Sequence, residues 1–183
     1  MTRDTWEFGP GNGTVTVHTD VTGPAARTGH RLTIDMEQWS AELTVADGVP
    51  VGVAASIDVE SLRVVSGEGG VTPLTGPEKA IARGNALKSL NASKAHTITY
   101  DATSITATEN GFRLDGTLTI NNNEHPHPLD VEVSGPDDAR QANIETVVSH
   151  REFGLKPYSM MMGALKVVDD VRVVITVDLP PAG

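Results

Sequence analysis

The chain has 183 residues, no cysteine, 24 acidic and 14 basic side chains, and a formal net charge of −10. This length predicts a single domain spanning residues 1–183. The lack of thiols excludes disulfides, zinc–thiolate sites, iron–sulfur clusters and a cysteine nucleophile. The acidic balance and the scarcity of aromatic side chains make a nucleic acid a poor partner, and the same charge disfavours docking on an anionic membrane.

The N-terminal segment contains no apolar run of signal-peptide length, and no stretch approaches the ~20 apolar residues of a membrane helix. We therefore expect a cytoplasmic protein without a transmembrane segment.

Alternation of apolar and polar residues, the signal of half-buried β-strands, dominates the chain. In chain order the predicted strands are 14–19, 31–36, 42–45, 51–59, 62–65, 97–101, 103–108, 112–120, 129–133, 142–148 and 171–179. The pair Asn110-Gly111 predicts a tight hairpin between two of these runs. Many antiparallel strands with short turns are typical of a sandwich or a barrel.

One segment, residues 78–90, breaks this alternation and predicts helix. Pro77 suits a first helical turn, and Ile81, Leu87 and Leu90 have the spacing of a core-facing stripe. Gly84 weakens the pattern, so we predict one or two short helices.

The motifs of common catalytic sites are absent from the sequence. There is no phosphate loop, no Gly-x-Ser-x-Gly elbow and no His-Glu-x-x-His. His125 and His127 could join His150 or His18 in a metal site, but two flanking prolines favour a strand edge instead. We expect no metal and no cofactor.

Two features suggest contact with an apolar ligand. His30 shares its strand face with Leu32 and Ile34, so it either closes a barrel end through hydrogen bonds or contacts a ligand there. The run Met160-Met161-Met162 either lines an apolar site or packs in a corner.

Several short strings, in order between residues 14 and 179, resemble the YceI-like family of polyisoprenoid-binding, lipocalin-like proteins, in the form of its actinobacterial branch. The matching strings are residues 29–34 with Trp39-Ser40, 57–62, 116–120 followed by Pro126, 153–159, 163–167 and 169–171. Asn122 stands where the family usually has Gly, His125 replaces a basic residue, and Phe153 replaces a Trp of the nearest branch.

The resemblance implies an all-β fold, an extended eight-stranded antiparallel lipocalin-like barrel with one or two short helices. It implies non-enzymatic binding, storage or transport of an isoprenoid lipid, a polyprenyl chain or an isoprenoid quinone, in the lumen. Dimers occur in the family, so a homodimer is among the expectations. The residues expected to contact the ligand are His30, Leu32, Ile34, Trp39, Phe112, Leu118, Tyr158, Met160, Met161 and Met162.

Small residues would leave room in such a lumen, and the small lining candidates are Ala54, Ala55, Ala102 and Ala107. If His30 and Lys156 both lay beside the head group, a phosphate would be favoured over a quinone ring.

Two other functions remain open at the level of sequence. An enzyme could use His30 or Tyr158 as an acid or base toward an apolar substrate. Alternatively, the protein could have a structural or stress-response role, with the barrel filled by its own large side chains. Those side chains would be Leu32, Ile34, Phe112, Leu114, Leu118 and Tyr158.

Overall fold

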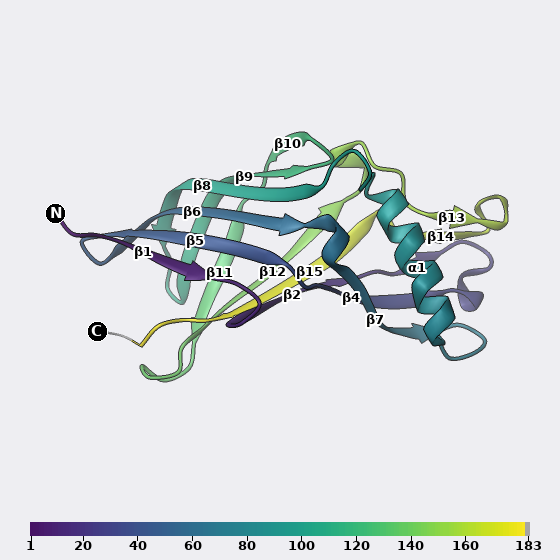
Figure 1. Cartoon of the computed structure of the whole chain (residues 1–183), viewed down its shortest axis with the longest axis horizontal. Helices are drawn as coiled ribbons and strands as arrows, with labels where there is room; N and C mark the ends of the chain where they lie inside the picture. Colours follow the sequence, from purple (N-terminus) through teal and green to yellow (C-terminus); the bar gives the residue numbers. More distant parts are fainter. Residues whose placement is uncertain (182–183) are drawn as a thin grey trace.

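The chain folds into a curled antiparallel sheet that encloses a barrel, with one helix at its side (Figure 1). The structure is a computed structural model that describes residues 1–181. Twelve strands belong to this sheet, and three short strands form a second one.

Eight long strands make up the wall, three of them bent and so divided into two segments. The bent strands are β1 (Arg3–Phe8) with β2 (Gly13–His18), β4 (His30–Met36) with β5 (Trp39–Ala46), and β6 (Val49–Asp58) with β7 (Leu62–Gly69). The other five are β8 (Thr97–Ala107), β9 (Gly111–Ile120), β11 (Leu129–Ser134), β12 (Gln141–Ser149) and β15 (Asp170–Asp178).

Pairing between the last strand and the second closes the ring. β15 pairs with β12 on one side and with β2 on the other, from Val177↔Gly13 to Arg172↔His18. β2 pairs in turn with β4, while β5 pairs with β6, and only Glu37 and Gln38 separate β4 from β5. The predicted all-β class, an antiparallel lipocalin-like wall, is therefore confirmed, but the main sheet has twelve strands rather than eight, with β10 (Asn123–Pro126) beside β9.

The wall splits where β7 diverges from β8, and α1 (Gly76–Ser89) covers the gap. Thr75 begins this helix with a capping box, because the Glu78 carboxylate accepts from Thr75 N at 2.7 Å while Thr75 Oγ1 accepts from Glu78 N. α1 is one continuous helix. Gly84 has open space beside it, so no neighbour packs against that position. Leu87 and Leu90 pack on the core as predicted, whereas Ile81 is exposed.

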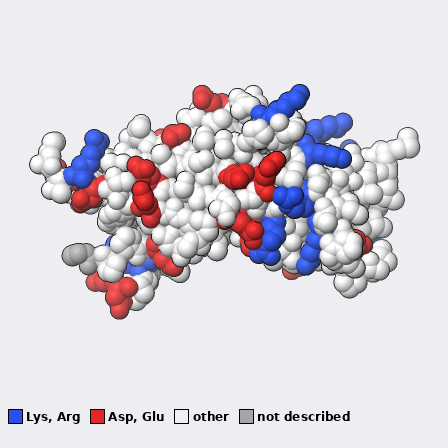
Figure 2. All heavy atoms as spheres, viewed as in Figure 1, with Lys and Arg blue, Asp and Glu red and all other residues white. Residues whose placement is uncertain are grey.

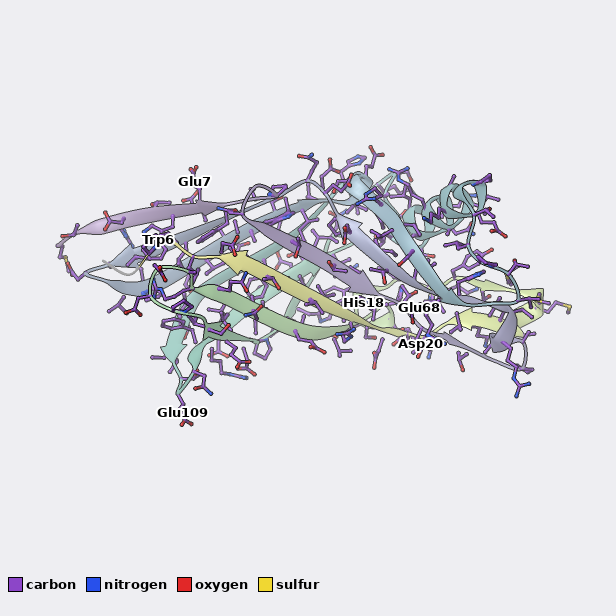
Figure 3. All side chains as sticks on the ribbon, turned by 90° about the horizontal axis from the view of Figure 1, so that it is seen from below. Trp6, Glu7, His18, Asp20, Glu68 and Glu109 are labelled. Atoms are coloured by element: carbon purple, nitrogen blue, oxygen red, sulfur yellow. The ribbon has the colours of Figure 1, made fainter. Side chains whose placement is uncertain are left out.

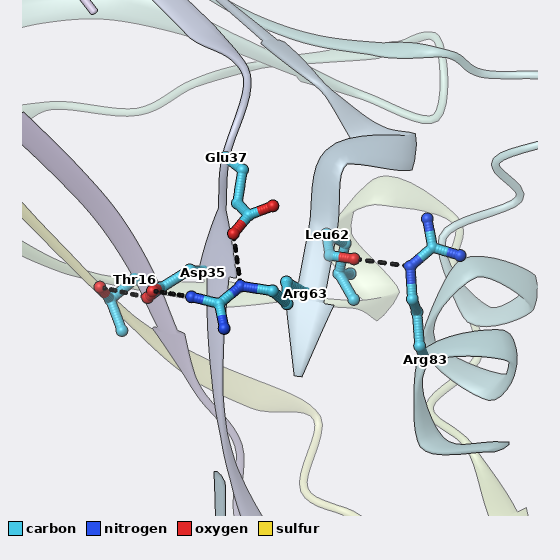
Figure 4. A network of polar contacts seen from close by, with 6 residues as sticks. All are labelled: Thr16, Asp35, Glu37, Leu62, Arg63 and Arg83. Atoms are coloured by element: carbon cyan, nitrogen blue, oxygen red, sulfur yellow. Dashed lines mark hydrogen bonds and ion pairs between the residues drawn. The ribbon is translucent and has the colours of Figure 1, made fainter. Parts of the chain in front are cut away.

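Arginine side chains fasten α1 to the strands beneath it (Figure 4). Arg83 Nε donates to the Leu62 carbonyl at 2.8 Å, and Arg63 on β7 pairs with Glu37 and with Asp35. Asp35 also accepts a hydrogen bond from Thr16 Oγ1 at 3.1 Å. This network links the helix through β7 and β4 to β2.

The second sheet lies at the end of the molecule that is far from both termini (Figure 1). It consists of β3 (Val21–Thr22), β14 (Leu165–Val167) and β13 (Ser159–Met160). Four 3-10 turns complete the fold: η1 (Ala26–Thr28), η2 (Val59–Ser61), η3 (Arg151–Phe153) and η4 (Met161–Gly163).

The main difference from the predicted strands is β1, which the sequence reading omitted. Its residues do alternate, and Trp6 and Glu7 point to opposite sides of the strand (Figure 3). Most of β1 is exposed, however, so its apolar residues give only a weak signal. The two runs 97–101 and 103–108 form one strand, β8, with a register shift between Ala102 and Ser104.

Phe153 anchors the end of the wall at which β9 and β12 finish. Its side chain is fully buried against Ile120, Val148 and Leu155. The Phe153 carbonyl accepts hydrogen bonds from the side-chain amides of Asn121 and Asn123, at 3.1 and 3.0 Å. The turn these asparagines belong to needs left-handed backbone, which Asn tolerates, and Asn122 has φ 57°.

Replacing Phe153 with Ala should lower the free energy of unfolding by about 3–5 kcal/mol, because the cavity left behind cannot collapse against strands fixed by hydrogen bonds. Urea denaturation measures the change. Phe8→Ala is the matched control, because Phe8 is only partly buried, and its loss should be clearly smaller. Equal losses in the two variants would contradict the anchoring role.

Candidate ligand-binding site

An apolar cavity of about 620 Å³ occupies the half of the barrel nearest α1. All eight long strands contribute inward-facing side chains to it, and α1 and the second sheet line its outer end. Aliphatic side chains of Val, Leu and Ile, such as Val15, Val17 and Val173, make up most of the wall. An eight-stranded barrel is about the size that either fills with its own side chains or holds one small ligand, and here the interior is open.

Seven of the ten predicted contact residues line this cavity. They are His30, Leu32, Ile34, Trp39, Leu118, Tyr158 and Met160. Phe112, Met161 and Met162 do not line it, so the interpretation of these three as lining residues is wrong.

Phe112 lies on the expected face of its strand but beyond the closed end of the cavity. Leu114 and Leu118, on the same face of β9, line the cavity. Phe112 instead packs against the buried cluster of Tyr100, Ala102, Leu114 and Leu129. Alternation predicts which face a side chain occupies, but not its height in the barrel.

Met161 and Met162 point into solvent from the loop after β13. Met162 is fully exposed, and both residues have left-handed backbone with φ 55°. The left-handed turn directs both side chains away from the wall, so neither the lining nor the packed-corner interpretation holds for them. Met160, just before the turn, borders the cavity and is partly exposed.

Of the four alanines predicted to line the lumen, only Ala55 does so. Its neighbour Ala54 points outward from β6 and is exposed, because successive residues of a strand face opposite sides of the sheet. Ala102 is buried in the packed cluster at the closed end, and Ala107 is exposed at the end of β8.

His30 lies at the outer end of the cavity and is hydrogen-bonded there. Its Nε2 donates to the Thr72 carbonyl at 2.8 Å, and its ring covers Gly70, where a Cβ would come within 2.4 Å of Nε2. Glu78 borders the same opening, and the backbone and hydroxyl of Thr75 lower the pKa of its carboxyl. Lys156 is exposed and lies outside the cavity, whereas Lys166 reaches its rim.

A polar pair within the apolar wall was missed by the sequence reading. His127 Nε2 and Thr146 Oγ1 lie 2.7 Å apart, and both residues line the cavity. The Tyr100 hydroxyl donates to the His127 carbonyl at 2.9 Å, with its ring over Gly116, where a Cβ would come within 2.5 Å of the ring. This arrangement fixes the segment that carries His127.

Burial shifts the pKa values of Tyr100 and His127 so that the neutral form of each side chain is favoured. It raises the pKa of Tyr100 to about 12, with a further contribution from Asp115. It lowers the pKa of His127, against a small opposing effect of Glu152. The wall therefore presents a neutral imidazole to the lumen.

For Thr146 and Tyr100, the alternation of the sequence does indicate that the side chain faces inward. Thr146 lies between Ile144 and Val148 on the inward face of β12, and Tyr100 shares its face with Ile98. For His127 the flanking prolines indicated a strand edge, and that signal concealed its inward position.

Within residues 1–181 no three histidine or acidic side chains cluster closely enough to hold a metal ion. His125 instead lies edge-on to the Phe153 ring, with centroids 5.0 Å apart. No helix in this part of the chain has both the length and the apolar character to cross a membrane.

The lowered pKa of His127 predicts a pH-dependent stability. As the pH falls below the ordinary histidine value of about 6.5, the unfolded chain takes up the proton first, so folding stability is lost. Urea denaturation at about pH 7.5 and about pH 5.5 should show a smaller acid-induced loss in His127→Gln than in the wild type. Gln keeps a donor near Thr146 without titrating, and the other histidines act equally in both proteins. Identical losses would contradict the assignment.

Comparisons with known proteins agree with this architecture. A model of the YceI-like domain matches residues 6–179. The solved structure of Burkholderia cenocepacia BcnA superposes with a TM-score of 0.68 at 13% identity, covering 91% of this chain and 96% of that one. The Campylobacter jejuni YCEI protein gives 0.58 at 14% identity, covering 82% and 85%.

No curated protein matches the chain in sequence. The two structures, at such low identity, show a shared fold alone. The family model, in contrast, covers nearly the whole chain and includes every strand of the wall except the first residues of β1. The chain therefore belongs to the YceI-like family.

Proposed function

We propose that the protein binds an isoprenoid lipid, a polyprenyl chain or an isoprenoid quinone, in the barrel lumen and stores or carries it without chemical change. The observation that carries the proposal is the apolar cavity of about 620 Å³. This volume lies within the roughly 300–1,000 Å³ of ordinary small-molecule sites. Family membership supports the same ligand class.

Burial of the tail alone provides enough free energy for binding. About 20 tail carbons at ~0.8 kcal/mol each give a gross gain of roughly 16 kcal/mol. Association and ordering cost roughly 4–15 kcal/mol. The difference of roughly 1–12 kcal/mol favours binding over this whole range without a catalytic or charged group.

The polar side chains of the site suit a ligand that carries an uncharged polar group into the lumen. His127 and Thr146 offer hydrogen bonds to a carbonyl or hydroxyl group that enters with the tail. A phosphate bound jointly by His30 and Lys156 has no support, since Lys156 lies outside the cavity. Lys166 is the lysine that lines the cavity, so it lies within reach of a head group at the rim.

The cavity itself weighs against a filled barrel. Five of the six large side chains that could have filled the lumen line it instead: Leu32, Ile34, Leu114, Leu118 and Tyr158. An enzymatic role would need His30 or Tyr158 to act as an acid or base. The Nε2 proton of His30 is committed to Thr72, which favours binding over catalysis.

Native mass spectrometry tests the proposal directly. The protein purified from the organism that encodes it should carry an isoprenoid at close to one per barrel, and organic extraction should remove it. Mass spectrometry of the extract then identifies the lipid. A delipidated protein that shows no saturable binding to any polyprenyl lipid or quinone would overturn the proposal.

A matched pair of substitutions tests the location of the ligand. Ala55→Trp places an indole in the lumen and should weaken binding of a quinone probe at least about tenfold, because the ring takes volume that the tail needs. Ala54→Trp places the same ring on the outer face and should bind like the wild type. Circular dichroism verifies that both variants fold. Equal affinities would show that the ligand binds elsewhere.

A further inference from the structure

Exposed apolar side chains gather at the open end of the barrel. Among residues 1–181, eight large apolar side chains are exposed. Five of them lie at or beside this end: Val71, Ile81, Met160, Met161 and Met162. Ile81 and Met160 also line the cavity, so they mark where the lumen meets solvent.

Three segments form this end, which we call the mouth end: residues 21–30, 69–77 and 154–168. Contacts between them show that they are one surface. Ala25 N donates to the Ala164 carbonyl at 2.8 Å, and a Cβ at Gly29 would come within 2.6 Å of Leu165 Cδ1. His30 joins the first segment to residues 69–77 through its hydrogen bond to the Thr72 carbonyl.

The mouth end has a charge opposite to that of the whole protein. Its three segments contain Arg27, Lys156 and Lys166, and Glu78, which directly follows the segment 69–77, is the acid that borders the same opening. The local balance is therefore basic in a chain with a net charge of −10. On the face shown in Figure 2 this end is largely uncharged, with basic side chains beside it. The acids Asp20 and Glu68 lie behind it, toward the middle of the molecule (Figure 3).

The two outermost methionines are held in solvent by the backbone. Consecutive left-handed residues other than glycine cost conformational energy, and such strain tends to occur at functional sites. The ammonium group of Lys166 lies close behind them, 3.5 Å from where a Cβ on Gly163 would be. An apolar tip with basic groups behind it suits a membrane interface, where acyl chains lie beneath phosphates.

We propose that the mouth end docks on anionic phospholipid bilayers. Met161 and Met162 enter the interface, while Arg27, Lys156 and Lys166 face lipid phosphates. The lumen then opens toward the bilayer, so an isoprenoid can pass between the two without crossing water. This inference rests on the proposed lipid-binding function and specifies where the lipid is exchanged.

Flotation with vesicles tests the docking. The wild type should bind vesicles of phosphatidylcholine and phosphatidylglycerol, and bind pure phosphatidylcholine more weakly. The double variant Met161→Ser/Met162→Ser should lose roughly tenfold in affinity for the mixed vesicles. Val49→Ser/Val147→Ser is the matched control, because it removes two apolar side chains that are about half exposed and lie outside the mouth end, and it should bind like the wild type.

A charge variant separates the electrostatic contribution to vesicle binding from the apolar contribution of the methionines. Arg27→Gln/Lys156→Gln should weaken binding to the anionic vesicles by about fivefold for each side chain and leave binding to phosphatidylcholine unchanged. Both residues are exposed and lie outside the cavity, so neither change touches the lumen.

Absence of wild-type binding, or equal losses in the methionine and control variants, would overturn the proposal. So would a methionine variant that only turns a dimer into a monomer, because the surface would then be a contact between copies. Binding of a quinone probe dispersed in detergent is measured in parallel. If docking fails while the probe still binds, the lumen function stands; if the wild type does not bind the probe, that function fails by itself.

Discussion

Closure of the sheet through the β15–β2 pairing is the constraint on which the rest of the structure depends. It joins the two ends of the chain, since residues near 175 pair with residues near 15. Once the ring is closed, every inward side chain faces the other strands rather than solvent, and eight strands set a fixed internal width. The inward aliphatic side chains then surround a cavity that a flatter sheet could not have enclosed.

The same wall fails to close at one place, where a helix takes the position of a strand pairing. Strand β7 bends away from β8 after Asp58, and α1 spans the gap without filling it. The helix is attached by the Arg83 bonds and by its apolar face, not by a strand ladder. This attachment involves fewer backbone hydrogen bonds than a strand ladder would, because α1 satisfies most of its own backbone groups internally.

Alternation in the sequence predicted most of the wall and the inward faces, because side-chain direction has a period of two whatever the surroundings. The position of a side chain along the barrel axis depends on strand register and shear, and these are defined only in the assembled sheet. Phe112 and Leu118 therefore had identical signals, yet one packs in the closed end and the other lines the cavity. His127 was hidden by its prolines, and the outward turn of Met161 and Met162 depends on backbone angles that no pattern predicted.

The net charge of the chain is an average over a molecule that is longer than the distance over which its charges act in salt solution. In physiological salt, the Debye length is about 8 Å, whereas the 11 residues of β8 alone extend roughly 35 Å. An acid at a closed-end turn, such as Glu109 between β8 and β9, is therefore screened from anything that approaches the opposite end. A membrane would sense mainly the local side chains, and there the balance is basic. An acidic protein of this shape can thus repel anions along its walls and still attract them at its opening.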